Sequence, residues 1–368
     1  MIYLDHGATA FPKAPGVAAA MFEALGRCAN PGRGGYPAAM AAAEEVYACR
    51  ELASKLFDCQ PEQVVFTSSC TQGLNTAIRT LVKPGDRVVI TGFEHNAVTR
   101  PLHGLGADMV VAGRKLFDWE DTLTCWEAAL KTRPVAAVFT HVSNVFGYVL
   151  PIEQMAELCR KYRVPFLVDG AQSAGMLPLK LEELGADFIA MPGHKGLLGP
   201  HGTGALWVRK DVQLAPLRQG GTGSASESMI QPGMMPDSLE SGTLNLPGIA
   251  GLRAGMAVAL TEMNGTHERI VGMCDFMREA LLELPNVRVY TPRGASLVSF
   301  NVEGVGSQIA ASMLDQAGIA VRGGLHCAPG VHRFLHTLEG GCVRVSPGRE
   351  NTRDQCAKLV REISHMTR

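Results

Sequence analysis

The stretch FIAMPGHKGLLGPHGTGALWV, residues 188–208, places one lysine, Lys195, among glycines and beside a histidine. FIAM (188–191) and GALWV (204–208) are short apolar runs, so the pattern predicts two buried strands joined by the loop that carries the lysine. A lysine in a loop is usually solvated by water. The neighbouring glycines also leave room for a backbone segment or a ligand to approach its amine.

Similar apolar runs alternate with helical patterns over residues 60–210. Strands separated by helices of about 10–15 residues are typical of βαβ units, which predicts a largely parallel sheet covered on both faces. In such sheets, ligands bind at the carboxyl ends of the strands. The remaining predicted strands are 64–67, 87–91, 108–112, 136–142 and 165–169, and the predicted helices begin at 72 and near 97 or span 119–131 and 152–163.

The pattern changes after residue 210. Residues 210–246 are rich in Gly, Ser, Pro and Met, which predicts irregular backbone of a length that is usually functional. The rest of the chain predicts a long helix (248–284), strands at 287–290, 296–302, 319–322 and 341–346, and helices at 307–317 and 351–366. We therefore expect an α/β protein with a large domain, residues 15–246, built on a mostly parallel seven-stranded sheet. A smaller α+β domain would comprise residues 247–368 together with 1–14.

The composition is that of a globular protein of 368 residues, with a formal net charge of −1 and no blocks of like charge, so we expect no nucleic-acid partner. The N-terminus has no basic region followed by a long apolar stretch, and no run approaches the roughly 20 apolar residues that span a bilayer. Ten cysteines occur without a CxxC pair, so we expect reduced thiols rather than disulfides or a zinc ribbon. These features predict a cytoplasmic protein without a membrane partner.

Polar residues follow several of the predicted strands. Ser68, Ser69, Cys70 and Thr71 form a small-residue turn that opens a helix. Such a turn is either a phosphate seat, since helix N-termini bind anions, or an ordinary Ser/Thr cap. His95 follows the strand at 87–91, where a histidine is usually just a hydrogen-bonded loop residue.

Asp169 ends the strand at 165–169, where a carboxylate is poorly solvated and needs a cation or a strong donor. It could bind Mg²⁺, but the chain has no GxxxxGK[ST] loop, and no GxGxxG motif follows the first strand. One ligand would satisfy these groups jointly, namely a pyridine ring with a phosphate, a phenolic oxygen and an aldehyde. Asp169 would keep the ring nitrogen protonated, and Lys195 would bond to the aldehyde. Gln172 would reach the phenolic oxygen, His95 would stack on the ring, and the 68–71 turn would hold the phosphate.

Three motifs, in this order, resemble the class V aminotransferase superfamily of pyridoxal-phosphate enzymes. They are VDGAQSAG (168–175), PGHKGLLGPHGTG (192–204) and RGGLHCAPG (322–330). The last is most similar to the cysteine desulfurase and selenocysteine lyase branch. The resemblance extends from YLDHGATA near the start to VRVSPGRENT near the end. It implies the PLP-dependent transferase fold (fold type I) and pyridoxal 5′-phosphate as the cofactor.

The resemblance also implies site residues. Thr243, in ESGTLN, would reach the phosphate of a neighbouring subunit's cofactor, which implies a homodimer. Arg344 would bind the substrate α-carboxylate, with Arg322 and Asn144 nearby. Family members carry a hydroxyl residue two positions before the His–Lys pair, where this chain has Pro192, so the phosphate would depend more on the remaining contacts. The implied cofactor-contacting residues are Cys70, Thr71, His95, Asn144, Asp169, Gln172, His194, Lys195 and Thr243.

Cys327 is the candidate reactive thiol. It lies in a glycine-rich loop beside His326, with Arg322 nearby in the sequence, and a neighbouring cation favours the nucleophilic thiolate. The spacing of His332 and His336 after Cys327 would also suit a metal, but no fourth ligand is near, so we expect no metal.

We expect an enzyme that removes sulfur from L-cysteine, leaving alanine and a persulfide on Cys327. Lys195 would move protons at the substrate carbons, with His95 beside the cofactor. Cleavage of L-selenocysteine and transfer of an amino group to a keto acid are the alternative enzymatic hypotheses. A catalytically inactive sulfur-carrier scaffold is the alternative from another class. The sulfur acceptor, whether a protein or a small thiol, stays open.

Overall fold

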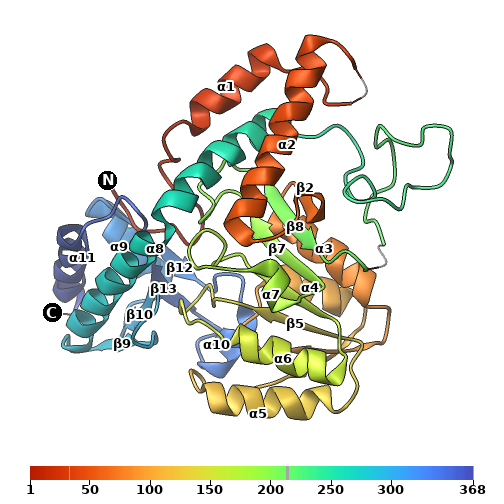
Figure 1. Cartoon of the computed structure of the whole chain (residues 1–368). Coiled ribbons are helices and arrows are strands. Elements are labelled where there is room, and N and C mark those ends of the chain that lie inside the picture. Colours follow the sequence, from red (N-terminus) through yellow and green to blue (C-terminus); the bar gives the residue numbers. More distant parts are fainter. Residues whose placement is uncertain (33, 213–214, 368) are drawn as a thin grey trace.

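A seven-stranded sheet lies at the centre of the computed structural model, which describes residues 1–32, 34–212 and 215–367 (Figure 1). β8 runs antiparallel to both of its neighbours, and the other neighbouring pairs are parallel. The prediction of a mostly parallel seven-stranded sheet is therefore confirmed. The strands lie in the order β2 (Val64–Thr67), β8 (Gly204–Val208), β7 (Phe188–Pro192), β6 (Phe166–Asp169), β5 (Ala136–Thr140), β3 (Arg87–Ile90) and β4 (Asp108–Val111).

Helices cover both faces of this sheet because its central strands are apolar on both sides. In β5, Val138 packs into the core on one face and Phe139 into the core on the other. The first face is covered by α3 (Cys70–Leu81) and α4 (Asn96–Gly104). The second face is covered by α2 (Pro37–Phe57), α5 (Trp119–Leu130), α6 (Ile152–Tyr162) and the short α7 (Leu181–Leu184).

A four-stranded antiparallel sheet forms the second part of the protein, at the left in Figure 1. α9 (Ser307–Gln316) and α11 (Arg353–Met366) pack on it around a separate apolar cluster. The first residues of the chain join this part, since β1 (Ile2–Tyr3) pairs in parallel with β11 (Ile319–Ala320). The strand order of the sheet is β12 (Arg322–Gly324), β13 (Cys342–Val345), β10 (Val298–Val302) and β9 (Val287–Val289).

The long helix α8 (Leu246–Leu282) connects the two parts. Its first turns contribute Ile249 and Leu252 to a core of the large sheet, and later turns contribute Met273 and Met277 to the cluster of the small sheet. The domain boundary at residue 247 stays a prediction, because one continuous helix belongs to both cores. Although α8 has 37 residues, neither it nor any other helix in the described residues is apolar over enough of its length to cross a bilayer.

The structure differs from the sequence prediction in one strand and in several helices. The single strand expected at 319–322 is divided into β11 and β12, because residues 319–320 pair with β1 while residues 322–324 pair with β13. The helices α1 (Val17–Arg27), α2, α7 and α10 (Pro329–Phe334) were not predicted. The alanine-rich segment of α2 has only a weak apolar period, and this helix is instead specified by packing on α8 and the sheet.

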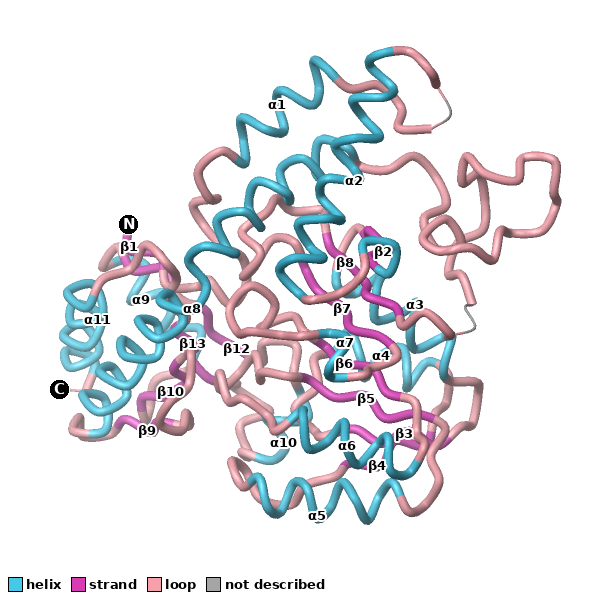
Figure 2. The backbone as a smooth tube through the Cα atoms, in the orientation of Figure 1, coloured by secondary structure: helices cyan, strands magenta, loops and turns pink. Residues whose placement is uncertain are grey.

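Residues 209–212 and 215–245 contain no helix or strand, and Figure 2 shows them as a long loop near α2. The prediction of irregular backbone is confirmed for these residues, and positions 213 and 214 lie outside the described residues. Glu240 fastens the end of the loop, since its carboxylate accepts hydrogen bonds from Arg50 Nη2 of α2 and from the backbone N–H of Phe66, both at 2.6 Å. The residues around Thr243 therefore have a defined position.

Candidate active site

The residues predicted to bind a ligand follow the carboxyl ends of the strands of the large sheet. Asp169 is the last residue of β6, and its partner in the register of β5 is Thr140, also a last residue. Asn144 follows β5, Lys195 follows β7, and His95 lies between β3 and α4. Because parallel strands end at the same edge, the fold brings together groups that are distant in the sequence.

Asp169 has only 2% of its surface exposed. Its Oδ1 accepts hydrogen bonds from the backbone N–H of Ala171 at 3.0 Å and from the thiol of Cys70 at 3.5 Å. Burial raises the pKa of Asp169, while the Ala171 hydrogen bond and the charge of Lys195 lower it. Burial also raises the pKa of Cys70 well above its usual value, so its thiol is protonated and donates. Within the described ranges, no hydrogen bond involves Asp169 Oδ2, so this oxygen can accept a proton donor from a ligand.

The glycines around Lys195 let neighbouring loops pack against the turn that carries it. A side chain at Gly196 would collide with the carbonyl of Ala174, and one at Gly193 would collide with the hydroxyl of Thr203. Burial lowers the pKa of Lys195, and the positive charge of Arg344 lowers it further. The amine therefore loses its proton more readily than a solvated lysine, as a group that must bond covalently or move protons requires.

His95 is the N-cap of α4, and its Nδ1 accepts a hydrogen bond from the backbone N–H of Ala97 at 3.0 Å. A ring whose Nδ1 accepts carries its proton on Nε2 when it is neutral. Burial lowers the pKa of His95 to about 4, and the charges of Lys195 and Arg322 act in the same direction. His95 is therefore neutral at pH 7, with an Nε2–H donor.

The turn at residues 68–71 is a helix cap, as one of its two interpretations predicted. Ser69 accepts a hydrogen bond from the backbone N–H of Gln72 at 3.2 Å. The first N–H groups of any helix lack partners within the helix, so those of Cys70 and Thr71 remain available for an anion. Binding of a phosphate at this turn stays a prediction.

Arg344 lies on β13 with 2% of its surface exposed. Its Nη2 forms a 2.8 Å ion pair with Asp5 Oδ1, and its Nη1 donates to the carbonyl of Asn144 at 2.9 Å. Its Nε has no hydrogen-bond partner in the described part of the chain. Arg322, exposed on β12, is its partner in the sheet register. Two guanidinium groups with donors to spare can bind a carboxylate.

The N-terminal segment contributes residues that sequence reasoning missed. Gln172 donates from Nε2 to the carbonyl of Gly7 at 3.0 Å, and the hydroxyl of Thr9 lies 3.1 Å from His194 Nδ1. The contact predicted between Gln172 and a cofactor oxygen stays a prediction. The sequence signal for this segment was the motif YLDHGATA (3–10). The motif resembles the family but assigned no role to any one of its residues.

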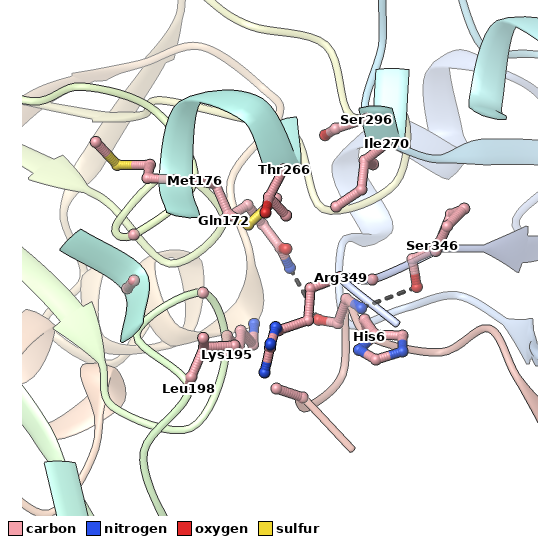
Figure 3. Close-up of a pocket in the computed structure, with 18 of the residues that line it drawn as sticks. His6, Gln172, Met176, Lys195, Leu198, Thr266, Ile270, Ser296, Ser346 and Arg349 are labelled. Carbon is pink, nitrogen blue, oxygen red and sulfur yellow. Dashed lines mark hydrogen bonds between the residues drawn. The ribbon is translucent and has the colours of Figure 1, made fainter. Parts of the chain in front are cut away.

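A cavity lies beside Lys195 and Gln172 (Figure 3). The N-terminal segment, α8 and the loop after β13 form the rest of its wall, with Arg349 held by Glu262 at 3.0 Å. The Lys195 side chain therefore borders a cavity whose wall comes from several parts of the chain.

Cys327 lies in the short loop between β12 and α10. Its carbonyl accepts a hydrogen bond from the backbone N–H of Asn96 at 2.7 Å, and the carbonyl of His326 accepts one from Asn144 Nδ2 at 2.7 Å. The φ angles of His326 and Cys327 are 49° and 57°, a conformation that costs energy in residues other than glycine. These contacts fasten a loop of the small sheet to the strand ends of the large one.

The last two predictions concern Thr243 and a metal. Thr243 is exposed and borders a surface hollow with Tyr47 and Arg50, and none of the residues around this hollow borders the Lys195 cavity. Within the ranges that the structure describes, no group of three His, Cys, Asp or Glu side chains is arranged to hold a metal ion. His332 is buried, and its Nδ1 pairs with Thr337 Oγ1 at 2.9 Å.

A parallel α/β sheet with a buried carboxylate near a loop lysine, joined to a small α+β part, is the architecture of fold type I enzymes. The chain matches the family model described as aminotransferase class-V over residues 2–359. The chain belongs to this family, as its motifs predicted.

Its relatives are named cysteine desulfurases. A probable cysteine desulfurase of Methanothermobacter thermautotrophicus is 32% identical, and the match covers 99% of this chain and 95% of that protein. A probable cysteine desulfurase of Pyrococcus abyssi is 31% identical over 94% of this chain and 89% of the relative. The apo structure of a cysteine desulfurase from Thermococcus onnurineus superposes with a TM-score of 0.91 at 29% identity, covering 100% of this chain and 94% of the other.

Proposed function

We propose that the protein is a pyridoxal 5′-phosphate-dependent cysteine desulfurase that converts L-cysteine to L-alanine and leaves the sulfur as a persulfide on Cys327. The observation that carries this proposal is the docking of the Cys327 loop. Asn96 and Asn144 hold the loop by its carbonyl groups, and these residues adjoin the strand ends that carry His95 and Asp169. Sulfur abstraction requires a thiol nucleophile at this place, whereas amino-group transfer does not.

The residues fit the cofactor. The free Oδ2 of Asp169 suits a protonated ring nitrogen, and the lowered pKa of Lys195 suits a bond to an aldehyde. The α3 N-terminus, with Thr71, and His194, the residue before Lys195, suit a phosphate. When bound, the cofactor would supply a conjugated ring that stabilises negative charge on the substrate carbons.

The chain's own groups would carry the other steps. Arg344, with Arg322 and Asn144, would bind the substrate carboxylate and so orient its side chain toward Cys327. Lys195 would take the proton from the substrate α-carbon and later supply a proton to the β-carbon. The neutral His95 would face the ring and offer its Nε2–H as a donor.

Cys327 would act as the nucleophile. Its thiolate attacks the substrate sulfur, an S–S bond forms, and the substrate's C–S bond breaks with its electrons passing to the β-carbon. The net change is L-cysteine plus the Cys327 thiol giving L-alanine plus the Cys327 persulfide, so no external oxidant is needed. A protein or small-thiol acceptor would then remove the outer sulfur. L-Selenocysteine would fit the same groups.

The proposed active unit is a homodimer in which Thr243 reaches the partner's phosphate. The exposed apolar side chains of Tyr47, Met229, Ile230 and Met234 support this, because a second copy would cover them. Glu240, three residues before Thr243, forms an ion pair with Arg50 of α2, and this contact supports a fixed position for Thr243. We also propose a cytoplasmic location, in keeping with ten unpaired cysteines.

A product assay tests the function. The purified holoenzyme is mixed with L-cysteine, with and without dithiothreitol, and alanine, sulfide and pyruvate are quantified. Alanine and sulfide in equal amounts, with reductant needed for repeated turnover, are expected. Keto-acid-dependent loss of the amino group without sulfide would instead favour an aminotransferase.

A further inference from the structure

The carboxylate of Glu94 organises the turn between β3 and α4. Its Oε1 accepts hydrogen bonds from the backbone N–H of Thr91 at 2.8 Å and from the Thr91 hydroxyl, and its Oε2 accepts one from the backbone N–H of Gly92 at 2.6 Å. The Thr91 hydroxyl also accepts a bond from the backbone N–H of Phe93 at 3.3 Å. One side chain therefore fixes the backbone of residues 91–94.

Glu94 is a buried carboxyl group without a cationic partner. Only 1% of its surface is exposed, and no cationic side chain in the described ranges forms an ion pair with it. Burial raises the pKa of Glu94, and the hydrogen bonds of the turn lower it. Because burying a carboxyl group costs free energy that only its hydrogen bonds offset here, the shape of the turn is what this residue maintains.

The turn that Glu94 fixes contacts the Cys327 loop at two points. The backbone N–H of Asn96 donates to the carbonyl of Cys327 at 2.7 Å. The carbonyl of Gly92 packs against the first turn of α10, since a Cβ at Gly330 would lie 2.9 Å from its oxygen. A displacement of the turn would therefore displace the loop that carries the thiol.

The same turn contacts the loop that carries Asn144. Phe93 and Phe146 are both buried, and their rings meet edge to face with centroids 6.2 Å apart. Asn144, two residues before Phe146, donates to the carbonyl of His326. The turn therefore supports the Cys327 loop both directly and through the Asn144 loop.

We propose that Glu94 is a positioning residue for sulfur abstraction, which holds the 91–96 turn and thereby keeps the Cys327 thiol beside the strand ends of the large sheet. The inference rests on the proposed function, because it takes Cys327 as the nucleophile. Glu94 acts through the backbone, so its effect is on the rate of attack. Substrate binding, which the proposed function assigns to Arg344 and Arg322, does not depend on this turn.

Glu94→Gln is the main test variant because it keeps the size of the side chain. An amide has one acceptor oxygen, so its NH₂ group would face a donor of Thr91 or Gly92, and a buried donor would lose its partner. Thr91→Val is the milder variant, since it removes the hydroxyl and keeps both backbone bonds. Thr91→Ser retains the hydroxyl and should behave as the wild type.

Asp187→Asn is the matched control for stability. Asp187 is a buried carboxylate at the opposite edge of the sheet, where it accepts from the backbone N–H of Phe166, the first residue of β6, at 2.8 Å. It also forms a 2.8 Å ion pair with Arg209. This variant should destabilise the protein and leave the Cys327 loop in place.

Amide hydrogen exchange of the full chain, followed by nuclear magnetic resonance, reads the loop contact without any ligand. The probe is the N–H of Asn96, because Cys327 is its acceptor. We expect exchange about tenfold or more faster in Glu94→Gln than in the wild type, with a smaller increase in Thr91→Val. In Asp187→Asn the exchange should change only as far as global stability does.

Steady-state kinetics of the holoenzyme is the second readout. The kcat for alanine formation from L-cysteine should fall about tenfold or more in Glu94→Gln, with KM and cofactor affinity within about twofold of the wild type. His95 has its own anchor in the bond from Ala97, so its contact with the cofactor should persist. L-Selenocysteine, which depends less on the thiol, should lose less kcat.

The outcomes separate this inference from the proposed function. Unchanged Asn96 exchange in both Glu94→Gln and Thr91→Val overturns the inference whatever the enzyme does. Faster exchange with an unchanged kcat for L-cysteine overturns the positioning role, and so does an equal loss of kcat in Asp187→Asn. Failure of the wild type to form alanine from L-cysteine overturns the proposed function, and the exchange data then decide whether Glu94 holds the loop.

Discussion

The backbone N–H of Asn96 donates a 2.7 Å hydrogen bond to the carbonyl of Cys327. Asn96 opens α4 on the large sheet, while Cys327 follows β12 of the small sheet. This bond and that from Asn144 to the carbonyl of His326 hold the thiol loop in its left-handed conformation beside the predicted cofactor residues. The position of Cys327 is therefore a property of the junction between the two parts of the protein.

Asn144→Ala should lower kcat/KM for L-cysteine about 10- to 100-fold, because the carbonyl of His326 loses its partner and the loop loses a bond across the junction. Asn301→Ala is the matched control, since its amide bonds to Tyr290 and Gly341 away from the site. Equal kinetics for wild type and Asn144→Ala would show that this bond is dispensable.

Lys195→Ala should abolish both turnover and the covalent trapping of the cofactor on the chain by borohydride. The reason is that Lys195 is the amine placed at the strand ends with a lowered pKa. Lys210→Ala, an exposed lysine just after β8, should leave both intact. Mass spectrometry of tryptic peptides locates the trapped group, and trapping that survives Lys195→Ala would remove Lys195 from its role.

Mixing two inactive variants tests the composite site. If Thr243 serves the partner's site, a heterodimer of Lys195→Ala and Thr243→Ala subunits contains one intact site, formed by Lys195 of one subunit and Thr243 of the other. Random assortment of subunits should then restore about a quarter of the wild-type activity. No recovery after unfolding and refolding the mixture, with sedimentation confirming dimers, would show that Thr243 does not serve the partner's site.

Stability should fall as the pH drops from 6.5 toward 4. Burial lowers the pKa of His141 to about 4 and that of His326 to about 3, from a value of 6.5. The unfolded chain therefore binds more protons than the native one in this window, so the free energy of unfolding rises with pH there. Each buried histidine contributes a slope of about 1.4 kcal/mol per pH unit. Urea unfolding between pH 5 and 6.5 should show a shallower slope for His141→Gln, and an unchanged slope would contradict this account.

The parallel sheet was predictable because each strand is a short apolar run followed by a helical period, and the strand ends of a parallel sheet meet at one edge. That rule was enough to place His95, Asn144, Asp169 and Lys195 on the same edge. For the turn at residues 68–71 the sequence left a phosphate seat and a helix cap as alternatives, and the side chain of Ser69 accepts a hydrogen bond from the helix as a cap does.

Other features depend on contacts that local pattern does not encode. The division of residues 319–322 between two sheets follows from pairing with β1, which lies more than 300 residues away. The ion pair of Asp5 with Arg344 and the contacts of Thr9 with His194 require the same long-range docking of the N-terminal segment. The hydrogen bond from the Cys70 thiol to Asp169 depends on the direction of a side chain in the first turn of α3.

The most direct test of the sulfur-abstraction mechanism is the rate of alanine formation from L-cysteine by Cys327→Ser. Cofactor binding and substrate binding need Lys195 and Arg344 but no thiol, so the variant should bind both and change its visible spectrum on adding L-cysteine. A hydroxyl is a far weaker nucleophile than a thiolate near neutral pH, so alanine formation should fall by about 10² or more. Selenocysteine should be affected less, because a selenolate leaves more readily. Alanine formation from L-cysteine at near wild-type rate would contradict the persulfide mechanism and with it the central role of Cys327.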